Sequence, residues 1–484
     1  MRISPTHQNA RISRNSRPVS SVRTRVGVRV GGLALLALLG VVALASPAAA
    51  QDQADRIRRL EQQVQELRRA VEVREDDDLA GLRHQIEALT AELERLRLGE
   101  DVVRADSSRF GFGPGASKVY GTPQGVSIGG YGEMLYENFA DEREDGSPVG
   151  ARSQLDFLRA ILYAGYRFDD RFVLNTEIEF EHGSTEQAGS VSVEFAYLDY
   201  LFSERAGIRA GLVLLPLGFV NELHEPTTFL GTERPETERR IIPSTWREGG
   251  IGVFADFDDV QVRGYLVNGL DAVGGGSSNA EGFSAEGIRG GRQNGSKAIA
   301  EDIAIAARAD YTGVPGVVIG ASGFVGEAGQ NADDPTSPGD RLGVRTLILE
   351  GHAGYQANGF DLRALFATTH VDDAAALNAA LGFTGSESVG ERLNGWYAHA
   401  GYDVLRGAAT DVALTPYVRY ESIDTQATVP DGFAADPAND MEIWTFGAAL
   451  RPISQLIVKA DYQVRSTGAD NGVDQFDVAL GYIF

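Results

Sequence analysis

Cysteine is absent from the 484 residues of the chain, and lysine is nearly so, with only Lys118, Lys297 and Lys459. Without cysteine there is no disulfide framework, no thiolate metal site and no cysteine nucleophile. Positive charge is scarce in general, because 44 basic side chains stand against 68 acidic ones. So acidic a chain is repelled by phosphate backbones, and we therefore expect no nucleic-acid partner.

Long apolar runs are missing as well. The longest, GGLALLALLGVVALA at residues 31–45, is shorter than the ~20 residues that span a bilayer. It follows a region with seven arginines and no acid, and it precedes SPAAA, which ends at Ala50. This order predicts a secretory signal peptide over 1–50 rather than a membrane anchor. With no other candidate membrane helix, a membrane-embedded form of the chain must be a β-barrel.

A helical rhythm follows in residues 51–98, which contain no proline and one glycine, Gly81. Apolar residues recur at steps of three and four from Ile57 to Val71, and again from Leu79 to Leu96. These heptads predict a periplasmic coiled coil that joins protomers, and the alternative is one amphipathic helix on a domain surface. Residues 99–125 contain Gly, Ser and Pro without a pattern, which predicts a linker.

From residue 126 onward the rhythm changes to a period of two. In RFVLNTEIEFE, apolar side chains alternate with Asn175, Glu177 and Glu179, as in a strand with one apolar and one polar face. Pro416 predicts a bulge or local break in its strand. Sixteen strands are expected, at 127–139, 153–168, 171–183, 190–203, 206–217, 248–257, 260–269, 299–312, 315–327, 342–357, 360–371, 391–405, 410–424, 441–452, 455–466 and 473–484.

The connections between these strands alternate between tight turns and longer loops. Together with an even strand number, this alternation is typical of an outer-membrane barrel. We therefore predict an all-β fold, a 16-stranded antiparallel transmembrane β-barrel over 126–484. A soluble β-sandwich or solenoid is the alternative, but it would not require connections of alternating length.

The chain ends in FDVALGYIF, with Phe476, Val478, Leu480, Tyr482 and Phe484 on one face. A terminal outward aromatic residue resembles the signal read by the outer-membrane assembly machinery. We therefore expect that machinery and outer-membrane lipid as partners, and an outer-membrane location in a Gram-negative-type bacterium.

Sixteen strands are enough to enclose an aqueous channel, which predicts passive diffusion of small ions or solutes. Strand alternation assigns a lining of mixed sign to the wall of this pore. Its expected members are Arg159, Arg209, Arg263, Arg308, Arg419, Lys459, Glu177 and Glu179.

The two longest loops differ in composition. Residues 271–298 are rich in Gly and Ser, which predicts a flexible surface loop. The stretch 221–250 instead carries three prolines and the apolar Phe229, Ile241 and Trp246, which allow it to pack against a wall. We expect the loop 217–247 to fold into the lumen as the constriction, with its arginines facing its glutamates. Its charged residues are Glu222, His224, Glu233, Arg234, Glu236, Glu238, Arg239, Arg240 and Arg247.

The segment 211–254, the heptad stalk and the terminal GYIF together resemble the phosphate-selective porin O and P family. That resemblance implies a homotrimeric, 16-stranded outer-membrane porin whose third extracellular loop forms the constriction. The family lines its pores with an arginine ladder and lysine rings, whereas this chain has three lysines in all. Anions such as phosphate are therefore one expectation for the solute, and the resemblance alone does not decide it.

Two alternatives to a channel remain open. The barrel could act mainly as an anchor whose stalk tethers cell-wall material. It could also be a hydrolase, for which His370 beside Asp372 and Asp373 comes closest to a catalytic pair. Glu350 and His352 share a strand face, but two ligands do not make a metal site. We expect no catalytic residues, no metal and no cofactor.

Overall fold

The computed structural model describes residues 108–184 and 189–484, so the predicted signal peptide and coiled coil lie outside the described residues. The helices are α4 (Pro114–Gly121), α5 (Glu236–Arg240) and α6 (Ala374–Leu381). The strands are β1 (Gly125–Phe139), β2 (Gln154–Arg167), β3 (Phe172–Glu181), β4 (Val191–Ser203), β5 (Ala206–Leu214), β6 (Arg247–Asp256), β7 (Val260–Asn268), β8 (Ile303–Tyr311), β9 (Val317–Glu327), β10 (Arg345–Ala357), β11 (Phe360–Val371), β12 (Arg392–Tyr402), β13 (Ala413–Thr428), β14 (Asp440–Ile453), β15 (Leu456–Thr467) and β16 (Gln475–Ile483).

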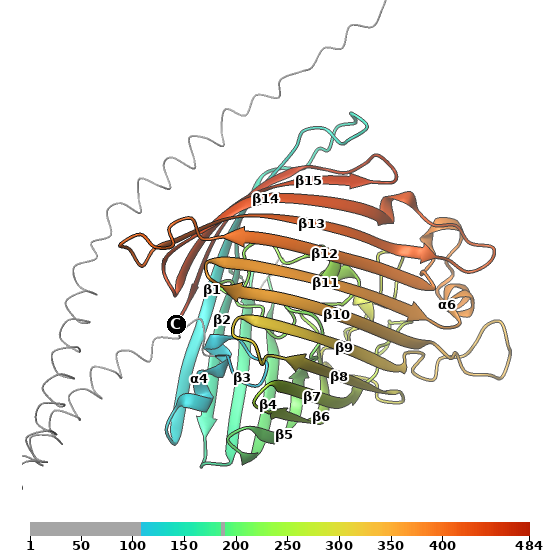
Figure 1. Ribbon diagram of the computed structural model, residues 1–484. Coiled ribbons are helices and arrows are strands. Elements are labelled where there is room, and N and C mark those ends of the chain that lie inside the picture. The colour runs from blue at the N-terminus through green and yellow to red at the C-terminus, as the bar shows by residue number, and fades with distance from the viewer. Residues whose placement is uncertain (1–107, 185–188) are drawn as a thin grey trace, which may run out of the picture. The chain divides into compact units, whose positions relative to one another are not determined.

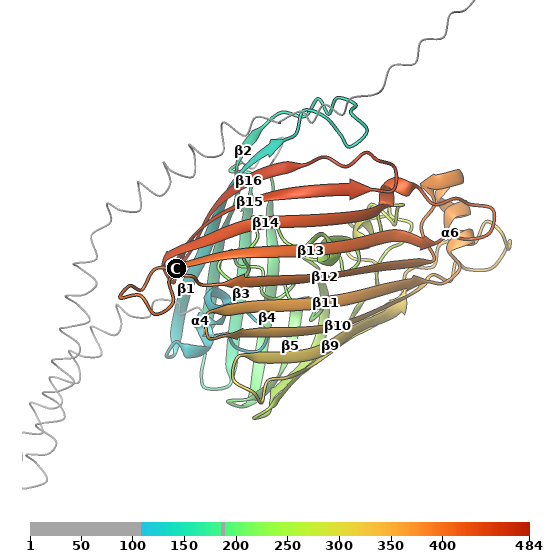
Figure 2. The same cartoon turned by 45° about the horizontal axis from the view of Figure 1, so that its top comes forward.

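These sixteen strands form a single closed barrel, which confirms the predicted fold class (Figures 1 and 2). Each strand pairs antiparallel with its neighbours in sequence, and β1 closes the ring on β16, with Tyr131 opposite Ile483. Beyond that pair, the amides of Gly130 and Phe484 each donate to the other's carbonyl, at 3.0 and 2.9 Å. Because the ring is closed, none of the sixteen described strands is an edge strand of an open sheet.

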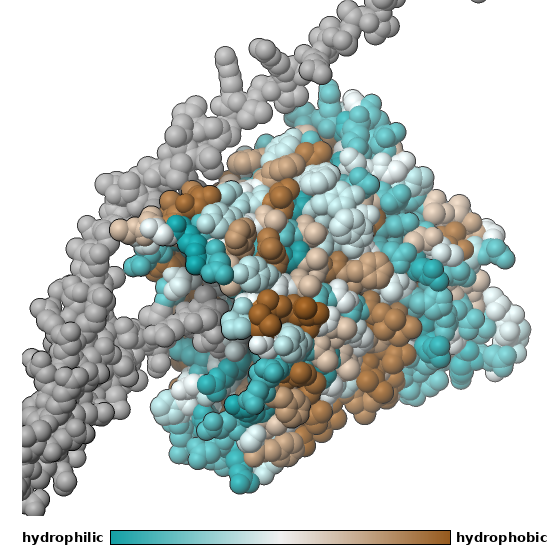
Figure 3. Space-filling view, viewed as in Figure 1, coloured by the Kyte–Doolittle hydropathy of each residue, from teal (hydrophilic) through white to brown (hydrophobic). Residues whose placement is uncertain are grey.

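Two-residue alternation decides which side chains enter the barrel. Along β8, each exposed residue is followed by a buried one from Ile303 to Tyr311. The exposed positions are apolar across most of the ring, as with Ile305, Ile319 and Leu349, which are 55%, 55% and 51% exposed. Apolar side chains lie across the strands in Figure 3, and hydrophilic ones gather over the long loops near α6. A barrel with an apolar outside and a polar inside is suited to a surrounding of lipid.

Aromatic side chains mark both ends of the outer face. At the tight-turn end, Tyr166 packs against Phe168 and Phe360 against Tyr402, with ring centroids 4.9 and 4.8 Å apart. Nearer the long loops, Tyr420 lies between Trp396 and Trp444, at 5.1 and 4.7 Å. Such bands are typical of membrane–water interfaces. Among the described residues, no helix is long and apolar enough to cross a membrane.

The connections alternate in length, as predicted. The turn between β10 and β11 consists of Asn358 and Gly359, both with positive φ (56° and 83°), which matches a tight hairpin turn of the Asn-Gly kind. Tight turns of this sort lie at the end that holds the C-terminus, and the long loops lie at the opposite end (Figure 1).

At Pro416 the predicted bulge is absent, and the predicted local break affects only the pairing with β12. Pro416 pairs in regular register with Ala448 of β14, while the ladder between β13 and β12 ends one residue away, at Tyr417 and Gly401. Proline lacks only the N–H group, and at this place no strand partner requires it. The register of β13 shifts instead near its other end, opposite Arg392.

The loop between β7 and β8 (residues 269–302, here L4) is not the flexible surface loop that its composition predicts. Phe283 and Gln293 are 2% and 0% exposed. The Gln293 amide replaces missing backbone pairing: it donates to the carbonyls of Gly269 and Ile299, both at 2.8 Å, and accepts from the Ile299 amide at 2.6 Å. The glycines allow tight bends in L4, and buried side chains such as Gln293 stabilise these bends through hydrogen bonds.

Residues 108–125, the described end of the range predicted to be a linker, also have definite structure. Phe110 and Phe112 are 3% and 1% exposed, and α4 follows them on the inner face of β1, β2 and β3 (Figure 1). Pro114 suits the first helical position because its fixed φ is helical and its missing N–H would lack a helical partner there.

Candidate functional site

The third long loop, between β5 and β6 (residues 215–246, here L3), folds back on itself at its base. The Asn221 side chain joins the two ends: its amide donates to the carbonyls of Leu215 (2.6 Å) and Trp246 (3.0 Å), and its oxygen accepts from the Trp246 amide (2.6 Å). Trp246 is fully buried, with its ring 4.7 Å from that of Phe324. This closed base directs L3 inward.

From that base, L3 reaches the wall opposite to the strands that carry it. Lys459 of β15 donates to the Gly231 carbonyl at 2.8 Å, and the Thr237 amide donates to Glu421 of β13 at 3.0 Å. Thr369 of β11 donates to the carbonyl of Ile241 at 3.0 Å. Contacts with β11, β13 and β15 place L3 across the lumen, as the sequence predicts.

The first half of L3 carries charges that bind the wall. Glu222 lies 3.6 Å from Arg263 of β7, and both side chains are less than 5% exposed. His224 lies with Nε2 3.2 Å from Glu177 of β3, while its Nδ1 contacts the Asn221 carbonyl at 2.8 Å. These two predicted site residues fasten the loop rather than face a passage.

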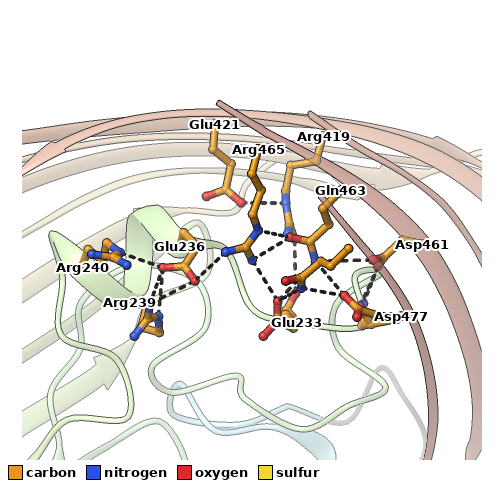
Figure 4. A network of polar contacts seen from close by, with 12 residues as sticks. Glu233, Glu236, Arg239, Arg240, Arg419, Glu421, Asp461, Gln463, Arg465 and Asp477 are labelled. Carbon is orange, nitrogen blue, oxygen red and sulfur yellow. Dashed lines mark hydrogen bonds and ion pairs between the residues drawn. The ribbon is translucent and has the colours of Figure 1, made fainter. Parts of the chain in front are cut away.

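Charges in the second half form the network shown in Figure 4. Glu233 accepts from Gln463, Arg465 and Gln475 of β15 and β16, at 3.2, 3.2 and 2.9 Å. Glu236 accepts from Arg239, three residues along the same short helix, at 2.9 Å. Unlike Glu222 and His224 of the first half, Glu233 and Glu236 line a cavity.

Glu236 also accepts from Arg240 at 3.1 Å. Burial alone would raise the pKa of Glu236, but Arg239, Arg465 and Arg240 outweigh it and lower the pKa to about 2. The predicted pairing of loop arginines with loop glutamates therefore occurs at Glu236, and it occurs within α5.

Two residues expected in that pairing lie elsewhere. Glu238 is buried and accepts from the Val220 amide (2.8 Å) and the Tyr397 hydroxyl (2.7 Å). Burial raises its pKa to about 7 despite these hydrogen bonds. Arg247 begins β6 and lies 2.5 Å from Glu194 of β4.

All eight predicted wall residues face inward, but most of them bind other wall groups. The Arg209 guanidinium binds Asp199 through two hydrogen bonds of 2.9 Å, and Arg263 and Arg308 share Asp310 at 2.6 and 2.7 Å. The other wall residues also have partners: Arg419 contacts Glu421 at 2.9 Å, Lys459 the Phe229 ring at 3.7 Å, Glu177 contacts His224, and Arg159 contacts Glu133 and Glu179 at 3.4 and 3.5 Å.

L3 separates two cavities of the barrel, each lined in part by charged side chains. The outer one measures about 560 Å³, and predicted residues line it: Arg159, Glu233, Arg234, Glu236 and Arg239. The inner one, of about 740 Å³, lies toward the tight turns and is lined by groups that include Arg363, Asp361, Arg451, Phe219 and Leu230. Phe229 lines the outer cavity and Leu230 lines the inner one, so the backbone of L3 passes between the two cavities at these residues.

Sequence reasoning missed several lining residues. Arg289 of L4 lines the outer cavity and a further one of about 500 Å³, which it shares with Arg239, Arg240 and Arg292. L4 is fixed over L3, because Arg292 donates to the Thr245 carbonyl at 2.6 Å. The glycine-rich composition of L4 gave no sign of its buried contacts, whereas the alternation of β15 could have indicated that Arg465 faces inward.

The side chains considered for a metal site or for hydrolysis, His352 and His370, bind neighbouring side chains of the barrel. His352 lies 2.7 Å from Glu350 and 2.9 Å from Asp310, with Arg308 3.0 Å from the same ring nitrogen. In the described part of the chain, no group of three or more His or acidic residues could hold a metal ion. His370 contacts Asp372 at 2.9 Å, but its side chain is 48% exposed and lies on the outward side of β11, away from the lumen.

Comparison with known proteins gives one relative in sequence and several in structure. No family model matches the chain. An uncharacterized protein of Aquifex aeolicus (strain VF5) is 36% identical over 398 residues, which is 81% of this chain and 87% of that protein.

Three solved structures with a similar barrel have lower identity. OmpF of Salmonella typhi in complex with daunomycin is 15% identical (TM-score 0.48), over 74% of this chain and 97% of that one. An anion-selective porin from Comamonas acidovorans is 13% identical (0.46), over 74% and 99%. OmpT of Vibrio cholerae is 11% identical (0.44), over 75% and 99%.

Proposed function

The chain belongs to the same family as the uncharacterized Aquifex aeolicus protein, and from the geometry of its barrel we propose that it is an outer-membrane porin for passive diffusion of small ions and solutes. The apolar outer face and the two aromatic bands support insertion in a bilayer. Sixteen strands enclose a lumen wide enough for an aqueous path.

One observation carries this proposal: L3 crosses the lumen between two cavities, each of which has charged side chains in its lining. A barrel that served only as an anchor would need no cavity with charged groups on either side of an inward loop. L3 is thus the constriction, and Arg159, Glu233, Arg234 and Arg239 are the predicted charges that meet a solute at its outer side.

Small anions, phosphate among them, are the finer proposal for the solute. The support comes from Arg289, whose Nη1 is buried without a hydrogen-bond partner in residues 108–184 and 189–484. Burial, then Arg292 and Arg239, lower the pKa of Arg289, and Glu236 offsets them only in part. Lys459 does not add a positive charge to the open pore, because its ammonium group is fully buried against L3.

A homotrimer with a periplasmic coiled coil is also proposed, together with recognition of Phe484 by the assembly machinery. β1 begins at the tight-turn end, and Phe484 lies at the same end. In outer-membrane barrels the end with the short turns faces the periplasm, which supports a periplasmic location of the preceding segment. Phe484 is 50% exposed on the outer face. We propose no enzymatic activity.

Planar-bilayer recording of the purified protein tests the channel. Discrete conductance steps are expected, with a reversal potential under a KCl gradient on the anion side and with chloride current reduced by added phosphate. Absence of conductance would refute the porin and favour the anchor. Cation preference would refute the anion proposal alone.

A further inference from the structure

Residues 108–121, here the N-terminal plug, fill a part of the lumen beside β1–β3 that L3 does not fill. We propose that this plug is a second, fixed constriction: it closes the β1–β6 side of the periplasmic mouth and holds the first half of L3 in place. The proposal rests on the porin function proposed above and adds an element that the sequence predicts to be a linker.

The plug is attached to the wall on the inner face of the barrel. The Tyr120 hydroxyl donates to Asp199 of β4 at 2.6 Å and accepts from Arg209 of β5 at 2.9 Å. The Asn175 amide of β3 donates to the carbonyl of Ala116 at 2.8 Å. These partners are inward residues of three different strands, so the plug spans that sector of the wall.

Aromatic packing anchors the plug further. The guanidinium of Arg209 lies 4.4 Å from the Phe112 ring and 4.0 Å from the Tyr197 ring. Phe110 packs on Phe254 of β6, at 4.6 Å between centroids. Release of the plug would expose two buried phenyl rings and a paired charge to water, so the plug stays docked while solutes pass.

Glu225 connects the plug to L3. Its carboxylate accepts from the amides of Gly115 (2.9 Å) and Ala116 (3.0 Å), in the first turn of α4, and from the Tyr163 hydroxyl (3.2 Å). The glycines make this approach possible, because a Cβ at Gly113 would lie 2.5 Å from the Glu225 carboxyl carbon. L3 is therefore held at its first half by the plug and at its second half by the opposite wall.

The remaining opening lies on the other side of the barrel. Ser108, the first described residue, lines the inner cavity, and the rest of its lining comes from L3 and from the strands and turns of β8 to β14, including Thr312, Gln356, Asp403 and Arg451. A solute that passes L3 thus leaves beside β8–β14, along a path bounded by the plug.

Thiol labelling in the full-length chain tests the position of the plug, and the lack of native cysteine removes background. Asn175→Cys lies under the plug at a site 1% exposed, and Gln356→Cys lies in the open inner cavity. We expect a small, water-soluble methanethiosulfonate to label Gln356→Cys at least about tenfold faster. Equal rates would overturn the plug, whether or not the protein conducts.

Conductance tests whether the plug limits the aperture. Replacement of residues 109–121 by an equal number of Gly and Ser should raise single-channel conductance about twofold or more and open the Asn175→Cys site to label. Heat-modifiable migration on a gel confirms that this variant folds. Unchanged conductance in a variant whose Asn175→Cys site is labelled, or no conductance in any chain, would overturn the second constriction.

A disulfide tests whether the plug is fixed. In Val119→Cys/Gly165→Cys the two Cβ atoms would be 3.0 Å apart, so the two backbones must separate by roughly 0.5 Å or more to reach the ~3.5–4.5 Å of a disulfide. Because the plug is docked during conduction, the oxidised and reduced forms should conduct equally. A loss of conductance on oxidation that reverses on reduction would show a moving gate and overturn the proposal. The disulfide experiment does not use the Gly/Ser variant, so its result can be interpreted even if that variant fails to fold.

Discussion

At the residue scale, single polar side chains pair backbone groups that regular secondary structure cannot pair inside this barrel. Asn221 closes the base of L3, Gln293 replaces backbone pairing in L4, and Glu225 joins L3 to α4. Each satisfies buried backbone groups, which are costly to leave without partners. The loops hold their inward positions through a few such residues.

Asn221→Ala should lower the free energy of unfolding by about 2–4 kcal/mol, because the buried Trp246 amide and two carbonyls would lose their partner. Urea unfolding in detergent, followed by tryptophan fluorescence, measures this loss. The exposed Asn279→Ala in L4 is the control, and an equal effect of both changes would contradict the role of Asn221.

Glu225 and Glu238 should make stability depend on pH. Burial raises both pKa values from 4.5 to about 7 in the folded chain. Between these values the folded state binds more protons than the unfolded state, so stability is greatest below pH 4.5 and decreases as pH rises toward 7. The midpoint of thermal unfolding should fall across this window, and Glu225→Gln/Glu238→Gln should flatten the dependence. Stability that rises over the same window in the wild type but not in the double variant would refute this sign.

Arg289→Glu should shift the reversal potential under a KCl gradient toward cations, because it reverses an unpaired charge at the outer cavity. Arg205→Glu is the matched control, since Arg205 lies exposed at a tight turn beside Asp258. If both variants keep the wild-type reversal potential, Arg289 does not meet the permeating ion.

At the element scale, L3 and L4 form one inward unit. L4 covers the base of L3 through Arg292, and L3 contacts β11, β13 and β15 across the lumen. Most charged residues of L3 divide by position. Glu222 and His224 of the first half bind the wall, and Glu233, Arg234, Glu236 and Arg239 of the second half line the outer cavity. Glu238 is the exception, because it is buried against Tyr397.

Deletion of residues 222–240 should raise single-channel conductance severalfold, because it removes the part of L3 that separates the two cavities. Shortening the β9–β10 loop by residues 334–340, whose side chains are mostly exposed, is the control and should leave conductance unchanged. An unchanged conductance after the L3 deletion would place this loop outside the path.

At the scale of the whole molecule, the closed ring of strands turns its apolar side chains outward, toward the lipid. The stalk expected at residues 51–98 lies outside the described residues. Native mass spectrometry of the mature protein should give the mass of three chains if heptads join a trimer. The mass of one chain under the same conditions would contradict that assembly.

The sequence by itself determined the strands, because an apolar outside and a polar inside impose a period of two on every one of them, and connection length separated the two ends. It also placed L3 in the lumen, since its prolines and apolar anchors fit a packed loop. Tertiary structure alone decided which charges face solute. Glu222, His224, Glu238 and Arg247 bind partners far along the chain, and distance along a sequence does not reveal such pairs. The same reason hid L4 and the plug: both lack periodic patterning, and both are ordered by contacts with strands that fold around them.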